Sequence, residues 1–215
     1  MTAVRQLEPT ESVKGRPFTS TKLYERDLTI LGYMLEDVRA TLAEMAEGAI
    51  TIAAYEPIEW TVMGLARRLI VCDPMRIWKR SKTQMVGFFG ERYLDRDAAP
   101  LEAASAEIVL QFRDYPGIVS YTSIALADGN WANLVLHDAP SDREQRRSSA
   151  SHAEAASRLS PLYYTSVRIH NGYIPGGVMA GRSIVIERTK YWDYRSPRVW
   201  QAVRDLRPDG YPVMH

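Results

Sequence analysis

The fold is decided by residues 117–137, GIVSYTSIALADGNWANLVLH. The segments 117–126 and 131–137 are rich in β-branched and aromatic residues, and the polar turn Asp128-Gly129-Asn130 separates them. This pattern predicts an antiparallel hairpin, because a short turn that contains glycine can join two strands directly. The elements on either side of the hairpin then decide the topology.

Apolar spacing predicts a strand and a helix before the hairpin, and a helix and two strands after it. After Pro100, which suits the first position of a helix, apolar residues recur every three or four positions. The expected elements are strands 85–94, 163–170 and 182–192 and helices 100–115 and 141–159. The order β-α-β-β-α-β, with one extra strand, predicts an α+β fold. Its expected form is a ferredoxin-like (split βαβ) antiparallel sheet with both helices on one face.

The rest of the chain is expected to extend this module. Residues 1–20 are a polar leader, 21–84 an N-terminal helical region and possible degenerate first ferredoxin-like half, 85–192 the ferredoxin-like module, and 193–215 a tail with a short helix near 197–206. Within 21–84, the segment 49–55 is expected to be a strand. Residues 57–82 are expected to be helical in two pieces that break at Asp73-Pro74, because the residue before proline disfavours the helical conformation.

Residues 21–47 have the most regular periodicity of the chain. Their apolar residues alternate spacings of four and three, at Tyr24, Leu28, Leu31, Leu35, Val38, Leu42 and Met45. The spacing predicts a long helix that ends near Gly48, with a heptad-like apolar stripe. Two interpretations stay open: the helix lies on its own subunit, or it packs against a partner subunit.

Composition excludes several classes of protein. The 215 residues include 27 basic and 26 acidic side chains, a net charge of +1, so no general field favours nucleic acid or an anionic membrane. One cysteine, Cys72, rules out an intramolecular disulfide and a multi-cysteine metal site. The first residues lack a signal peptide's apolar core, and no run of 18 apolar residues occurs. We expect a cytoplasmic protein that binds neither nucleic acid nor membrane.

His152 is the first candidate functional residue. Ser141 and Glu144 form a capping box at the start of helix 141–159, whose apolar positions are mostly alanine. Helical spacing places His152 on the same face as Ala156, toward the core. Its open interpretations are a general base, a metal ligand or a hydrogen-bonded core residue. The lack of a second ligand nearby argues against zinc, whereas one axial histidine suffices for haem.

The remaining candidates follow from strand alternation. Trp131 and Asn133 point one way on their strand, and Tyr164, Arg168 and His170 point together on theirs. If this polar set faces the helices, Arg168, His170, Asn133 and His152 converge on a buried site. If it does not, the set lies on the outer face, where it meets solvent or a second subunit.

Residues 85–192 resemble the dimeric α+β barrel superfamily. Its members include cofactor-free antibiotic-biosynthesis monooxygenases, haem-degrading monooxygenases, chlorite dismutase-like proteins and haem-containing aldoxime dehydratases. DREQRRSSASHAEAA (142–156) is similar to the second helix of the monooxygenases, and ALADGNWANLVLH (125–137) to the hairpin of the aldoxime dehydratases. Two departures matter. The haem-ligand position of the haem-degrading group corresponds to Ala156, and Arg146 or Arg147 replaces the usual tryptophan.

The resemblance implies a homodimer of α+β barrel type with a small-molecule pocket between sheet and helices. We expect a haem-dependent oxidoreductase or N–O dehydratase (lyase) in which His152 ligates the iron. Trp131 and Tyr164 would line the haem site, and Arg168, His170 and Asn133 would act on the substrate. One alternative is a cofactor-independent monooxygenase or cyclase for a polyketide-like aromatic, with His152 as general base. Another is a non-catalytic ligand-binding protein.

Overall fold

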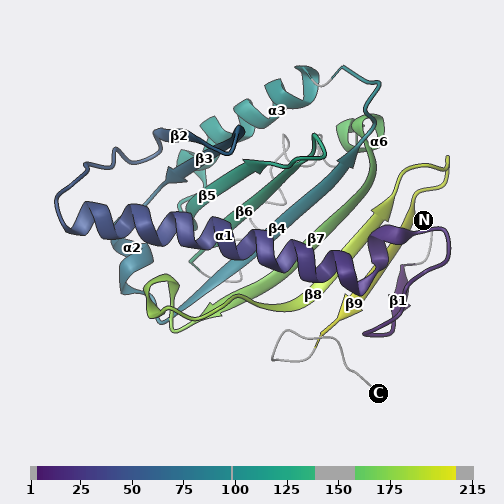
Figure 1. Cartoon of the computed structure of the whole chain (residues 1–215), viewed down its shortest axis with the longest axis horizontal. Helices are drawn as coiled ribbons and strands as arrows, with labels where there is room; N and C mark the ends of the chain where they lie inside the picture. Colours follow the sequence, from purple (N-terminus) through teal and green to yellow (C-terminus); the bar gives the residue numbers. More distant parts are fainter. Residues whose placement is uncertain (1–3, 98, 139–157, 207–215) are drawn as a thin grey trace.

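Nine strands form one continuous sheet in the computed structural model, which describes residues 4–97, 99–138 and 158–206 (Figure 1). The strands are β1 Arg5–Leu7, β2 Pro57–Val62, β3 Leu65–Val71, β4 Lys82–Arg92, β5 Ile118–Ala125, β6 Trp131–His137, β7 Tyr164–Pro175, β8 Val185–Asp193 and β9 Trp200–Asp205. The α-helices of the described part are α1 Thr21–Ala46, α2 Pro74–Lys79, α3 Ala99–Leu110 and α6 Ser160–Tyr163. Short 3-10 turns cover Pro17–Thr19, Gln111–Asp114 and Val178–Ala180.

The strand order is β1-β9-β8-β7-β4-β6-β5-β3-β2, so the sheet is open and has two edges. All neighbouring strands are antiparallel except β1 and β9, which makes the sheet mixed. The predicted hairpin is confirmed as β5 and β6, which pair from Ala125↔Trp131 next to the turn to Ile118↔His137 at the far end. The α+β class is therefore confirmed. Residues 139–157 lie outside the described part of the chain, so the expected helix 141–159 is not described except for its last two residues.

Helix α1 confirms the periodicity of 21–47. The Ser20 hydroxyl accepts a hydrogen bond from the Leu23 amide and caps its start. Its apolar stripe is buried against the sheet of its own chain, through Leu31, Met34, Leu35, Val38 and Leu42. Gly87 on β4 permits the close approach, since a Cβ there would lie 2.7 Å from Leu31 Cδ2. The intramolecular interpretation of the stripe is therefore correct.

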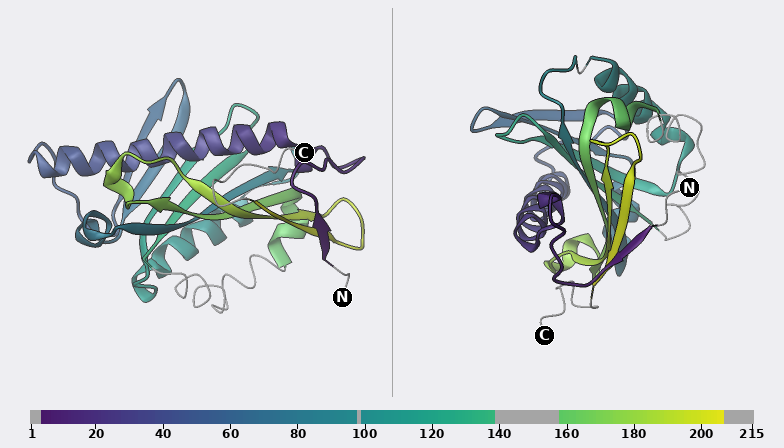
Figure 2. Two further views of the ribbon diagram at one scale, coloured as in Figure 1. Left: turned by 90° about the horizontal axis from the view of Figure 1, so that it is seen from below. Right: turned by 90° about the vertical axis from the view of Figure 1, so that its right-hand side faces the viewer.

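The sheet is covered on both faces. Figure 2 shows it edge-on, with α1 on one face and α3 on the other. The α1 face holds the largest apolar cluster, which includes Leu69, Met85, Phe89, Leu134 and Ile186. On the other face, no residue of α3 is fully buried in the part of the chain that the structure describes. No helix of the described residues is long and apolar enough to span a membrane.

Residues 57–71 correct the expected helix, because they form the β2–β3 hairpin. Its turn is Met63-Gly64, where both residues have positive φ, 50° and 79°. Two successive left-handed residues are typical of the tight turn that matches strand twist. Only the second helical piece exists, as α2, and Asp73 caps it by accepting a hydrogen bond from the Arg76 amide. The strand expected at 49–55 is also wrong, since that segment is irregular.

The tail forms a strand where a helix was expected. β9 pairs with β8, and β1 from the polar leader pairs with β9. Arg204 on β9 is fully buried and donates hydrogen bonds to the carbonyl oxygens of Glu8, Glu11 and Thr19 and to the Tyr191 hydroxyl. These bonds attach the N-terminal segment to the sheet.

Candidate functional site

A cavity of about 270 Å³ lies between α3 and the sheet, and we call it the inner cavity. Aromatic and aliphatic side chains form most of its wall, with a few hydroxyl and amide groups among them. The lining residues are Val86, Phe88, Leu101, Ala104, Ser105, Ile108, Val109, Tyr121, Asn133, Val135, Ser160, Tyr164, Val167, Ile169, Trp192 and Tyr194. An apolar hollow with a few polar groups is the usual form of a small-molecule site.

Strand register explains the floor of this cavity. Phe88 on β4 lies opposite Asn133 on β6 and Ile169 on β7, so these three side chains form one row across the sheet. One step along, Val167 lies opposite Trp192 on β8. Alternation sends both rows to the same face, which is the face that α3 covers.

A second cavity of about 380 Å³ adjoins the first, and we call it the outer cavity. The two share Leu101, Ser105, Tyr121, Asn133 and Tyr164. The outer cavity adds mainly polar and charged side chains, namely Arg68, Arg92, Glu102, Ala106, Ser123 and Trp131. The combined site is therefore apolar at one end and charged at the other.

The shared wall carries hydrogen-bonding groups. The Tyr121 hydroxyl donates to Asn133 Oδ1 at 3.0 Å, which orients the amide and leaves its NH₂ for a ligand. Burial raises the pKa of the Tyr164 phenol above its ordinary value, an effect to which Tyr121 adds and which the charge of Arg92 opposes. Burial also raises the pKa of Tyr194 to about 12, although a hydrogen bond with Ser160 lowers it. Both phenols are therefore protonated at neutral pH and can donate hydrogen bonds.

Tyr164 departs from the strict alternation expected for its strand. The register of β4 and β7 shifts between Glu91, which pairs with Ser166, and Arg92, which pairs with Tyr164. Thr165 is the extra residue of a bulge, so Tyr164 turns to the α3 face while Ser166 and Arg168 stay on the α1 face. Tyr164 and Trp131 do line the site, as the sequence predicts, but Tyr164 does not share a face with Arg168.

Gly90 makes room for the Tyr164 ring. A Cβ at Gly90 would lie 2.2 Å from Tyr164 Cε1, so the ring rests directly on the backbone of β4. We expect Gly90→Ala to displace the ring, to weaken ligand binding and to lower the free energy of unfolding by about 1–3 kcal/mol. Chemical denaturation and a binding titration measure the two effects.

Gly32→Ala is the matched control for Gly90→Ala. A Cβ at Gly32 has no neighbour within 4 Å, and the position is inside α1. This control is expected to stabilise by roughly 0.5–1 kcal/mol and to leave binding unchanged. Equal stability losses in the two variants would contradict the described packing.

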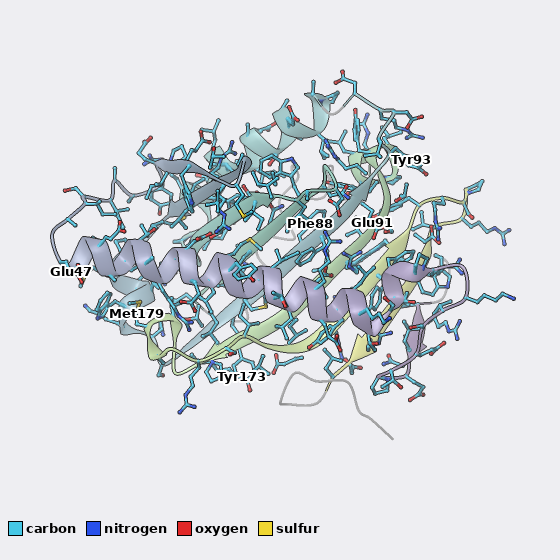
Figure 3. The ribbon with its side chains drawn as sticks, viewed as in Figure 1. Glu47, Phe88, Glu91, Tyr93, Tyr173 and Met179 are labelled. Carbon is cyan, nitrogen blue, oxygen red and sulfur yellow. The ribbon has the colours of Figure 1, made fainter. Side chains whose placement is uncertain are left out.

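Arg168 and His170 correct the predicted convergence, because they lie on the opposite face from Asn133. Arg168 donates to Asp27 Oδ2 at 2.6 Å and Oδ1 at 3.0 Å, and to Glu91 Oε1 at 2.9 Å. His170 Nε2 lies 3.0 Å from Asp27 Oδ2, and its Nδ1 lies 2.8 Å from the Thr189 hydroxyl. Glu91, the partner of Arg168 on β4, is labelled in Figure 3. The network attaches α1 to the sheet and lines neither cavity.

The haem prediction depends on His152, which lies outside the described residues. The described walls of both cavities contain no histidine, cysteine or methionine that could ligate iron. Residues 4–97, 99–138 and 158–206 also contain no group of three or more His, Cys, Asp or Glu side chains placed to hold a metal. Haem with His152 as its ligand therefore stays a prediction.

Sequence reasoning missed most of the cavity wall. Phe88 and Arg92 lie in strand β4, which has apolar residues on both faces. Alternation alone therefore cannot predict which face of such a strand points to a cavity. Trp192 and Tyr194 stand in a stretch rich in aromatic residues, and such a composition is typical of a pocket as well as of a core. The structure shows that some fill the core, as Tyr191 does, and others line the cavity.

Comparison with known proteins gives remote likenesses. No family model and no curated protein matches the chain. Among solved structures, protein SO0527 from Shewanella oneidensis is similar over 44% of this chain and 92% of that chain, with 10% identity and a TM-score of 0.40. A mutant of SnoaB, a cofactor-independent oxygenase from Streptomyces nogalater, is similar over 45% of this chain and 94% of that chain, with 15% identity and a TM-score of 0.35. Both likenesses are too remote to carry an argument.

Proposed function

We propose that this chain is a small-molecule enzyme that oxygenates a flat, largely apolar aromatic substrate without a cofactor. The observation that carries the proposal is the inner cavity, whose wall includes Phe88, Ile169, Val167 and Trp192. Such walls bind a planar hydrocarbon ring system by burial and by ring contacts. A ferredoxin-like arrangement of β4 to β7, with a homodimer as the assembly, is part of the same proposal.

The polar groups of the shared wall suit the anion that such chemistry requires. An electron-rich substrate with an ionised oxygen can react with O₂ directly, and its negative charge then needs hydrogen-bond donors. The Asn133 amide and the Tyr164 hydroxyl are donors at the place where both cavities meet. The overall reaction converts a ring CH₂ to C=O, with one oxygen atom from O₂ entering the product and the other leaving as water.

Oxygen uptake tests the proposal. Purified protein with an added iron chelator is mixed with a three-ring phenol that carries a ring CH₂, and O₂ and substrate are followed together. The proposal requires them to disappear in a 1:1 ratio without added cofactor. Turnover only after hemin is supplied, with a Soret band that His152→Ala abolishes, would instead establish the haem-dependent alternative. Tight binding without turnover would establish a ligand-binding protein.

A further inference from the structure

Arg92 lies at the charged end of the site with part of its hydrogen-bonding capacity unused. It continues the α3-face row of β4 and lines the outer cavity. Its Nη2 donates to the Gly129 carbonyl, and its backbone N–H donates to Asn130 Oδ1 at 2.9 Å. Its Nε is buried and has no hydrogen-bond partner within the described part of the chain. A buried donor left unpaired is costly, and more so when it is charged.

Among the described residues, Arg92 is the cation of the outer cavity that has no ion-pair partner. No carboxylate of residues 4–97, 99–138 and 158–206 forms an ion pair with Arg92. The other guanidinium of the outer cavity, that of Arg68, is paired with Glu59 at 2.7 Å. Glu102 of α3 lines the same cavity but is exposed.

We propose that the outer cavity binds an anionic oxygen group of the ligand through Arg92, so that the substrate class is aromatic acids. The inference rests on the proposed function, since the apolar body of the same ligand occupies the inner cavity. A guanidinium suits a carboxylate because its N–H groups lie in one plane and donate to both oxygens. The negative charge of Glu102 repels an anionic ligand in the same cavity. An anionic group therefore binds there only where Arg92 pairs with it.

Two fluorescent probes that differ by one anionic group test this inference. 8-Anilinonaphthalene-1-sulfonate and N-phenyl-1-naphthylamine share an aromatic body, and only the first carries a sulfonate. Titration of each into the full chain gives two dissociation constants, and their ratio isolates the contribution of the anionic group. The neutral probe alone reports whether the apolar cavity binds aromatics.

Three variants test which side chain recognises the sulfonate of the probe. We expect Arg92→Gln to raise the Kd of the sulfonate probe about 10- to 100-fold, as for loss of a hydrogen bond to a charged group. The Kd of the neutral probe should change less than about 2-fold. Arg92→Lys keeps the charge and should retain part of the preference. Glu102→Gln removes the opposing charge and should tighten the sulfonate probe only.

The two probes distinguish failure of the anionic site from failure of the aromatic cavity. Equal binding of both probes by wild type and Arg92→Gln would overturn the anionic site while leaving the aromatic cavity intact. Failure of the neutral probe to bind wild type would overturn the proposed function and the inference with it. A loss of both probes in Arg92→Gln, with an unfolding midpoint unchanged from wild type, would show that Arg92 shapes the cavity and does not read charge.

Discussion

Replacement of Asp27 by alanine is expected to lower the free energy of unfolding by about 3–5 kcal/mol, because the change leaves two nitrogens of the buried Arg168 guanidinium without their carboxylate partner. Glu91 then remains as the carboxylate that pairs with Arg168. Asp27 and His170 are 0% exposed, and Arg168 is 4% exposed. Asp27 accepts two hydrogen bonds from Arg168, and His170 Nε2 lies within hydrogen-bond distance of it. Because the site is buried, water does not readily replace these contacts, and the cost of the guanidinium nitrogens that lose their partner appears in stability. Urea unfolding of the variant measures it.

Two further variants separate the buried charge from other effects. Asp205→Ala removes an exposed partner of Arg188 and is expected to cost at most about 1 kcal/mol. The double variant Asp27→Leu with Arg168→Met replaces the ion pair by apolar side chains. It should lose less stability than the sum of the two single variants, since no buried charge remains unpaired. A loss below about 1 kcal/mol in Asp27→Ala would contradict the described network.

The same network predicts an acid-sensitive stability. Burial by itself would raise the pKa of Asp27, but the hydrogen bond with His170 and the charge of Arg168 outweigh it, so the pKa lies below 3.8. The stabilisation by ionised Asp27 is therefore full above the ordinary pKa and is lost as pH falls through the lower folded value. The difference in unfolding free energy between wild type and Asp27→Asn should be constant near pH 6 and should narrow below about pH 4. If the difference in unfolding free energy instead becomes larger as the pH falls, the pKa of Asp27 is raised in the folded state and not lowered.

Replacement of Ala104 by tryptophan is expected to raise the Kd of N-phenyl-1-naphthylamine on the order of 100-fold. Ala104 lies on α3 and lines the inner cavity, so an indole there occupies the volume that the ligand needs. Loss of roughly 100 Å² of apolar contact, at about 25 cal/mol per Å², corresponds to about 2.5 kcal/mol. Fluorescence titration measures the change, and oxygen uptake should fall in proportion.

Ala103→Trp is the matched control for this variant. Ala103 is the neighbouring residue of α3, is exposed and does not line the cavity. The same substitution there should leave the Kd of the probe within about 2-fold, because no cavity volume is lost. Equal losses in both variants would place the probe outside the inner cavity.

The sequence was most informative where burial affects one face of an element only. The stripe from Leu31 to Leu42 predicted α1, and the turn at Gly129 located the β5–β6 hairpin. The β2–β3 hairpin was missed, although Ile58 and Trp60 alternate with polar residues and Met63-Gly64 is a turn signal.

The site and the buried polar networks were less predictable, because their geometry depends on long-range pairing. Asp27 stands within an apolar stripe, and its partner Arg168 lies 141 residues away. The bulge at Thr165 turns Tyr164 to the other face of the sheet, and no pattern in the neighbouring sequence predicts this bulge. Arg204 is buried because carbonyl oxygens of the N-terminal segment surround it, which composition cannot show.

Methyl-labelled NMR of the full chain with bound N-phenyl-1-naphthylamine tests whether a flat aromatic ligand occupies the space between α3 and the sheet. We expect nuclear Overhauser effects from the probe to the methyl groups of Val86, Val135 and Ile169, which line the inner cavity. Effects to Leu31 or Val38 beneath α1 instead, or to no buried methyl group, would contradict this placement of the ligand.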